Sequence, residues 1–135
     1  MQSPRATQGS SYIPAIAVTG LTDSEDESRA LQAGFPAIVR NAYEAGVPIY
    51  VGSDAGGGIP HGLAAREMVL LQQSAGMPAL DVLAAGSWGA RAWLGLPGLV
   101  EGGAADLIVY EADPRADLAA VLSPQRIILK GRVVR

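Results

Sequence analysis

Two residues with chemically useful side chains border one glycine-rich loop. In "VPIYVGSDAGGGIPHG", residues 47–62, Asp54 ends an apolar strand and His61 precedes an expected helix. A carboxylate at the carboxyl end of a buried parallel strand faces the side of an α/β fold where ligands bind. An ionised group there is costly unless it is paired or bound to a metal. The two residues could therefore line one site, as metal ligands or an acid–base pair. Alternatively, Asp54 forms an Asx turn and His61 is a cap or a packed polar residue.

The loop between these residues contains three consecutive glycines. Gly56, Gly57 and Gly58 could let backbone amides approach an anion. The loop lacks the Lys-Ser/Thr pair of a P-loop and the spacing of a dinucleotide fingerprint, so a turn is the simpler interpretation. Metal sites usually need three or four donors, and the chain has one histidine and no cysteine. We therefore expect this chain alone not to build a complete metal site.

Other candidate residues have structural explanations. Glu67 follows on the expected helix, where it could brace the loop, but a solvated helix residue is the interpretation we favour. Trp88 and Trp93 are expected in the core or in an interface. Asp106 and Asp113 belong to turns near the C-terminus, and we assign them no chemistry.

Strands and helices alternate along the part of the chain that must position the loop. The apolar run 12–18 predicts a strand. Acidic residues then precede a helical apolar period that should reach Ala45, with Gly34 and Pro36 as interruptions. Gly46 is expected to end this helix as its C′ residue.

The rest of the chain moves from helices to strands. Residues 47–54 predict a strand that is apolar on both faces, as in a parallel sheet covered by helices. Residues 63–76 predict a helix, 77–96 two short helices, and 105–111 and 125–135 β segments, with a tight turn at Lys130 and Gly131. The strand at 47–52 needs neighbours on both edges, and the sequence offers too few. The chain therefore looks like part of something larger.

Composition narrows the class of protein. Hydrophobic residues make up 49% and charged residues 17% of the 135 residues, which excludes a disordered chain. The net charge is -3 with a single lysine, and no basic cluster suggests a nucleic-acid partner. No apolar run reaches the ~18 residues of a membrane span, and the polar start lacks the apolar stretch of a signal peptide. We expect a cytoplasmic protein with a mobile tail at residues 1–10.

Taken in order, these segments resemble the amidohydrolase superfamily, metal-dependent hydrolases, in its imidazolonepropionase and prolidase-like branch. "GVPIYVGSDAGGGIPHG" is similar to the last barrel strand of that family and the His-Gly after it. "AAREMVLLQQSAGMPALDVLAAGSWGARAWLGL" resembles the next helices, and "GLVEGGAADLIVYEADPRADL" with "IILKGRVV" resembles the final strands. The resemblance is colinear over about residues 11–135.

The resemblance implies an α/β fold: the C-terminal β/α units of a TIM-type (β/α)8 barrel, then strands of a small β-sandwich, as an incomplete barrel. The domains would be residues 11–97 and 98–135. It implies that Asp54 is a metal ligand and proton shuttle in the hydrolysis of amide, cyclic amide or peptide C–N bonds. A divalent ion, typically zinc, would serve the complete enzyme. His61 and Gly57 would face the substrate.

The family's other metal ligands are absent from this sequence. Two interpretations follow. The chain is the C-terminal part of an amidohydrolase, inactive alone and completed by the missing N-terminal barrel portion. Alternatively, it is a non-catalytic remnant that acts as a binding or oligomerisation module and associates through exposed strand edges. Whether this chain is an enzyme stays open at this point.

Overall fold

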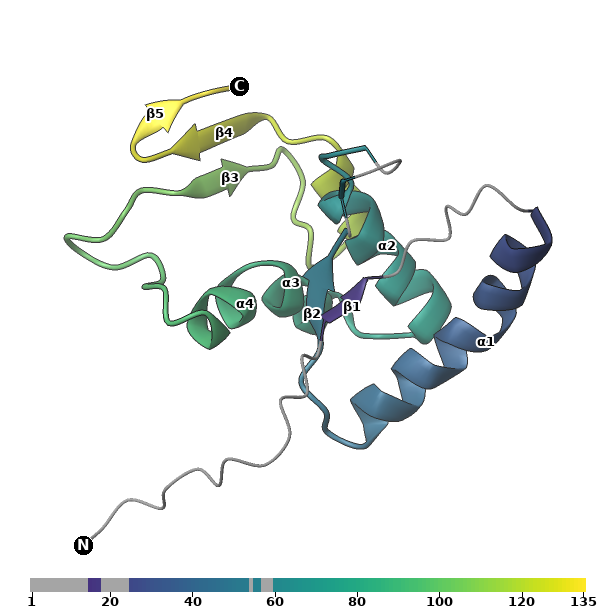
Figure 1. The fold of residues 1–135 in the computed structure, drawn as a ribbon. Helices are drawn as coiled ribbons and strands as arrows, with labels where there is room; N and C mark the ends of the chain where they lie inside the picture. Colours follow the sequence, from purple (N-terminus) through teal and green to yellow (C-terminus); the bar gives the residue numbers. More distant parts are fainter. Residues whose placement is uncertain (1–14, 18–24, 54, 57–59) are drawn as a thin grey trace, which may run out of the picture.

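The computed structural model describes residues 15–17, 25–53, 55–56 and 60–135 (Figure 1). The expected tail at residues 1–10 lies outside the described residues, as do both ends of the strand expected at 12–18. The elements are β1 (Ala15–Ala17), α1 (Glu25–Glu44), β2 (Tyr50–Gly52), α2 (Ala64–Ala75), α3 (Ala79–Gly86), α4 (Trp88–Trp93), β3 (Leu107–Val109), the 3-10 helix η1 (Leu118–Leu122), β4 (Arg126–Leu129) and β5 (Arg132–Val133). The expected change from alternating elements to strands is confirmed.

Helix α1 is continuous where the sequence suggested an interruption. It runs through Gly34 and Pro36, so the interruption expected there is wrong. Proline removes one backbone hydrogen bond from a helix, and α1 continues despite that loss. The end of α1 is as expected. Gly46 has φ of 76°, its N–H donates to the Tyr43 carbonyl at 2.9 Å, and the Val47 N–H donates to Ala42 at 2.9 Å. This bond pair is a Schellman motif.

The first sheet consists of two parallel strands. Ala15 pairs with Tyr50 and Ala17 with Gly52, so both strands end at the same level. Strand β2 is shorter than the expected 47–54, because its pairing with β1 begins only at Tyr50, and Pro48 before it has no N–H to donate. The described residues form no other strand beside β2.

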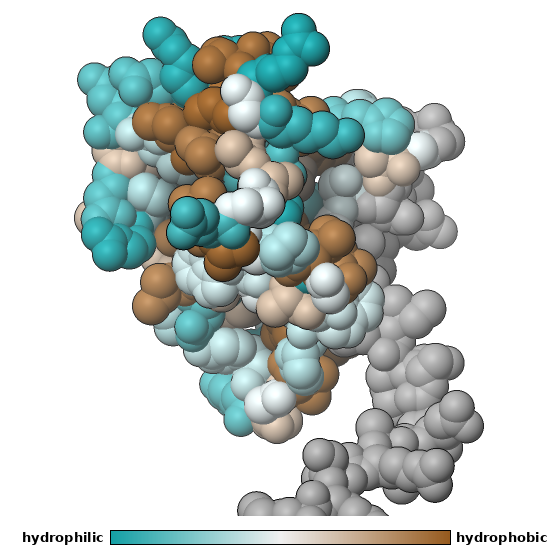
Figure 2. Space-filling view, turned by 90° about the vertical axis from the view of Figure 1, so that its left-hand side faces the viewer, coloured by the Kyte–Doolittle hydropathy of each residue, from teal (hydrophilic) through white to brown (hydrophobic). Residues whose placement is uncertain are grey.

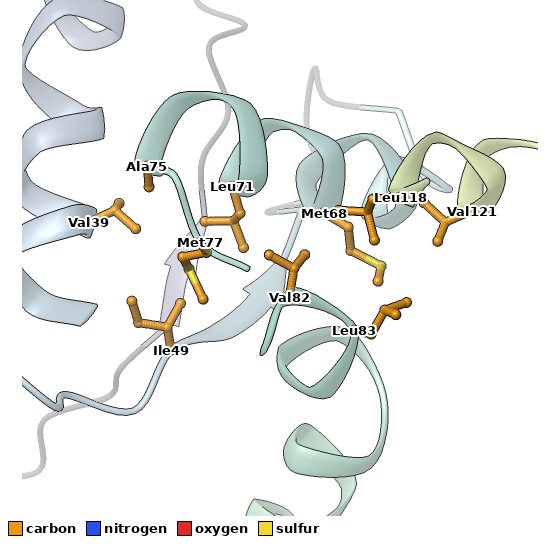
Figure 3. Packing of buried hydrophobic residues seen from close by; sticks show 10 residues of the cluster. All are labelled: Val39, Ile49, Met68, Leu71, Ala75, Met77, Val82, Leu83, Leu118 and Val121. Carbon is orange, nitrogen blue, oxygen red and sulfur yellow. The ribbon is translucent and has the colours of Figure 1, made fainter. Parts of the chain in front are cut away.

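Helices α2 and α3 pack over this sheet and enclose the core (Figure 3). Figure 3 shows Met77 lying between Leu71 of α2 and Ile49, and Val82 of α3 lying between Leu71 and Leu83. The helices pack closely, because a Cβ atom placed on Gly86 would lie only 2.8 Å from Met68 Sδ. The core consists of Val39, Ile49, Met68, Leu71, Ala75, Met77, Val82, Leu83, Leu118 and Val121.

The C-terminal part forms a second sheet of three antiparallel strands in the order β3-β4-β5. The turn between β4 and β5 lies at Lys130 and Gly131, with φ of 50° and 74°, which confirms the tight turn. Helix η1 was not expected. The Asp117 carboxylate caps it by accepting from the Ala119 N–H at 2.9 Å, and its buried Leu118 and Val121 join the core.

The fold is therefore mixed α/β, with two small sheets. Neither sheet closes within the part of the chain that the structure describes. The division expected at residue 97 stays a prediction, although η1 connects the C-terminal strands to the helical core. No helix among the described residues is long and apolar enough to cross a membrane.

Candidate functional site

The expected site begins at the carboxyl end of β2. Because β1 and β2 are parallel and in register through Gly52, the chain leaves both strands at the same edge of the sheet. Ser53 and Ala55 are half-buried there. Asp54, the expected catalytic residue and metal ligand, lies outside the described residues, and so does Gly57. The backbone on both sides of Asp54 thus fixes where the loop starts, while its role stays a prediction.

The loop returns to the fold at His61. This residue is exposed and stands in a bend just before α2. Gly62 has φ of 89°, a conformation that suits glycine. Residue Leu63 caps α2 without a side-chain hydrogen bond. The interpretation of His61 as a packed polar residue is therefore wrong, and a substrate-facing role stays a prediction.

Glu67 is a titratable residue whose exposure to solvent was predicted wrongly from the sequence. We favoured a solvated helix residue, but its side chain is only 4% exposed. Its Oε2 atom has no hydrogen-bond partner among the described residues. Burial raises the pKa of this carboxyl, and the neighbouring Arg66 guanidinium partly offsets that rise.

The sequence contained a signal for this burial. Glu67 lies four residues before Leu71 and next to Met68, so it falls on the apolar face of α2. Side chains in helices lean toward the N-terminus, and this directs Glu67 toward the first turn of α2. The described residues contain no group of three or more potential metal-ligating side chains. A complete metal site would therefore need donors beyond those described.

A groove lies at the opposite end of β2. It has a volume of about 290 Å³, and residues 46–50 form one wall with Met77 and residues of α3. The lining is mostly apolar, with Asp81 as its charged residue. The Tyr43 hydroxyl donates a hydrogen bond to the Asp81 carboxylate, and this bond raises the pKa of Tyr43.

Trp93 lies beside this groove. Its ring stacks on Tyr50 of β2, with 4.9 Å between the ring centroids and 21° between the planes. Trp88 and Trp93 are both 51% exposed. The expectation that they pack in the core is wrong, and the alternative of an interface remains. Sequence reasoning missed this groove, since it forms between an extended segment and a helix distant in the chain.

Comparison with known proteins identifies related chains. The model of the amidohydrolase family matches residues 16–134. An uncharacterized protein from Mycobacterium tuberculosis is 48% identical over 94 residues, which cover 70% of this chain and 25% of that protein. A protein from Mycobacterium bovis matches to the same extent.

Three solved structures superpose on most of this chain. A candidate prolidase from Bifidobacterium longum superposes with a TM-score of 0.71 and 35% identity, covering 85% of this chain and 30% of that one. A Xaa-Pro dipeptidase with methionine bound in its active site gives 0.70 and 26%, over 82% and 28% of the two chains. The A. niger ochratoxinase gives 0.66 and 26%, over 85% and 28%. The chain thus spans less than a third of the length of each of these proteins.

Proposed function

Because the chain belongs to the amidohydrolase family, we propose that it is the C-terminal part of a metal-dependent hydrolase of C–N bonds. The single observation that supports this proposal is the family match over residues 16–134, which contains both edges of the expected site loop. The resemblance to a candidate prolidase and a Xaa-Pro dipeptidase favours a dipeptide or similar small amide as substrate. The fold proposed for the complete protein is a (β/α)8 barrel with a small β-sandwich.

Asp54 is the reactive residue of the proposal. Its carboxylate accepts the proton of the attacking water and then donates it to the leaving nitrogen, as general base and then general acid. In this proposal His61 and Gly57 contact the substrate. A divalent ion, with zinc as the first choice, polarises the scissile carbonyl when bound. Asp54 would be its ligand from this chain, and the remaining ligands come from polypeptide absent here.

A reconstitution experiment tests this function. The chain is fused to the part of the Mycobacterium tuberculosis relative that it does not match, and zinc content and hydrolysis of Xaa-Pro dipeptides are measured. We expect bound zinc and hydrolysis from the fusion, and neither from the 135-residue chain alone. Asp54→Asn should lower kcat at least a hundredfold, the usual size of a general acid–base contribution. Unchanged kcat in this variant would refute the role of Asp54.

A second candidate function rests on the exposed apolar side chains. Trp88, Trp93 and Leu94 are each at least half exposed, and β2 has no described neighbour on one edge. Such surfaces suit a non-catalytic binding or oligomerisation module. Size-exclusion chromatography with metal analysis separates the two. A stable homo-oligomer of this chain, together with a fusion that has neither metal nor activity, would favour the module.

A further inference from the structure

Glu67 is a buried titratable residue to which the proposed reaction assigns no role. Its side chain is 4% exposed, and its Oε2 atom has no hydrogen-bond partner among the described residues. A buried polar atom without a partner costs free energy, and an apolar side chain of similar length would avoid that cost. The carboxyl group at this position therefore needs an explanation other than stability.

Glu67 also attaches the start of α2 to the core. Within the first turn, Ala64–Glu67, it is the buried residue, and the other three are exposed or half-buried. Leu63 offers no side-chain cap, and its carbonyl accepts from the N–H groups of Arg66 at 2.8 Å and Glu67 at 3.1 Å. The bend at His61 comes directly before this turn. The packing of the Glu67 side chain therefore determines where the turn and the bend lie.

The surroundings of this carboxyl favour its uncharged form. Burial raises the pKa of Glu67, and Arg66, the other charged residue of α2, offsets part of that rise. Helices α1 and α3, strand β2 and η1 pack against α2, and β2 has no charged residue. The charged residues described on the other elements have other partners or solvent: Arg40 bonded to the Ala75 carbonyl, exposed Glu44, Asp81 bonded to Tyr43, and Asp117 capping η1. An ionised carboxylate at this position would therefore be buried without compensation.

We propose that Glu67 is a positioning residue: its uncharged carboxyl lets the first turn of α2 pack on the core, and loss of the proton releases this turn together with the bend at His61. The proposal rests on the proposed function, in which His61 contacts the substrate, and it adds a pH dependence to substrate binding. The ionised carboxylate requires water, which reaches it when the first turn moves away from the core. His61 is then displaced, so KM should rise with pH.

Hydrogen exchange of backbone amides in the 135-residue chain tests the packing step. Protection factors, which correct for the intrinsic effect of pH on exchange, are measured from pH 5 to 8. Above the ordinary pKa of 4.5, the opened turn loses a proton that the packed turn keeps. Protection of the Arg66 and Glu67 amides should therefore fall about tenfold per pH unit until the folded pKa is passed. The Gly76 amide, which donates to Gln72 at the other end of α2, should change less.

Two variants that cannot lose a proton at this position separate ionisation from packing. Glu67→Gln and Glu67→Met should both abolish the pH dependence of protection in the first turn. Gln73→Met is the matched control, because Gln73 is exposed on the same helix, and it should keep the dependence of the wild type. Circular dichroism confirms folding, and either variant at position 67 is sufficient if the other does not fold. A wild type without the dependence, or variants that retain it, would overturn the proposal.

The fusion that tests the proposed function supplies the catalytic measurement. KM for a Xaa-Pro dipeptide should rise roughly tenfold from pH 5 to 8 in the wild type, within the hundredfold that a displacement of about 1 Å can cost. It should rise less in Glu67→Gln and Glu67→Met. An inactive fusion that keeps the pH-dependent protection would count against the proposed function and leave the effect of Glu67 standing. An active fusion with the same pH profile in all three proteins would overturn the positioning role and leave the proposed function standing.

Discussion

The helical layer around α2 buries its apolar side chains, whereas the three-stranded sheet β3-β4-β5 leaves many of its own exposed. Leu71 and Val82 are 3% and 0% exposed. Ile108, Leu129 and Val133 are 50%, 52% and 65% exposed. Figure 2 shows apolar side chains gathered over the sheet near the top of this face.

The polar groups of the two regions show the reverse distribution. The helical layer buries the Glu67 carboxyl without a partner among the described residues. In the C-terminal part, Asp106 accepts a hydrogen bond from the Lys130 N–H at 2.7 Å, and the exposed Asp113 pairs with Arg115 at 2.7 Å. Arg115 lowers the pKa of Asp113 to about 2. In the helical layer the Glu67 carboxyl thus lacks a described partner, and in the sheet β3-β4-β5 apolar side chains lack a cover. Both features are expected for a chain that spans under a third of the length of its relatives.

The largest effect should come from the residue that joins the two regions. Leu118 of η1 is 1% exposed within the helical core. Leu118→Ala should lower the free energy of unfolding by about 3 kcal/mol, the usual cost of such a cavity, measured by urea denaturation. Leu122→Ala in the same 3-10 helix is the control, because Leu122 is 46% exposed, and it should cost less than about 1 kcal/mol. Equal effects would show that η1 does not anchor the C-terminal strands.

Replacing the buried carboxyl should stabilise the helical layer. Glu67→Met should raise the free energy of unfolding at pH 7 by about 1–2 kcal/mol, because it removes a buried polar group without a partner. A destabilised Glu67→Met variant would mean that the carboxyl has a stabilising partner in solution.

The same carboxyl should make stability depend on pH. Burial raises the pKa of Glu67 above its ordinary value of 4.5. As the pH rises past that value, the unfolded chain loses this proton while the folded chain keeps it, so the wild type loses stability until the folded pKa is passed. Urea denaturation from pH 4 to 7 should show this loss in the wild type and a smaller one in Glu67→Met.

Replacing glycine by alanine should lower stability in the β4–β5 turn and raise it in helix α1. Gly131 in the β4–β5 turn has φ of 74°, so Gly131→Ala should cost about 1 kcal/mol. Gly34 lies inside α1, and no atom lies within 4 Å of a Cβ placed there. Gly34→Ala should therefore stabilise by about 0.5–1 kcal/mol. Thermal melting of both variants checks the signs, and a loss at Gly34 would contradict the continuous helix.

The smallest effect should come from the exposed face of the sheet. Leu129→Thr should change the free energy of unfolding by less than about 0.5 kcal/mol, because its side chain is 52% exposed. The same change at Ile128, which is half-buried, should cost more. Binding of a dye for exposed apolar surface should fall in Leu129→Thr. A large loss of stability there would mean that this face is already covered.

Local sequence signals predicted several features of this fold. Gly46 and the Lys130–Gly131 turn were predictable because a glycine at positive φ is a strong local requirement. The two short helices that meet near residues 86–89 were also predicted from the sequence.

Features that depend on tertiary packing were not predictable in the same way. Pro36 suggested a break, yet the helix continues through it, although proline removes one backbone hydrogen bond there. Helix η1 is set by Leu118 and Val121 reaching the core, a contact that no local pattern encodes. The loop edges of the expected Asp54 site were predictable from strand and helix signals, whereas the burial of Glu67 was missed although the residue lies on the apolar face of α2.

The contact between Met68 and Gly86 links the sizes of two positions in different helices. A Cβ atom at residue 86 would lie 2.8 Å from the Met68 sulfur, so a side chain at position 86 would require the flexible Met68 side chain to move or to be shorter. Among related chains, a residue larger than glycine at the equivalent of position 86 should therefore accompany a shorter side chain at the equivalent of position 68. The side-chain volume lost from α2 at position 68 would then be replaced by volume on α3 at position 86, and the distance between the two helix axes would stay the same.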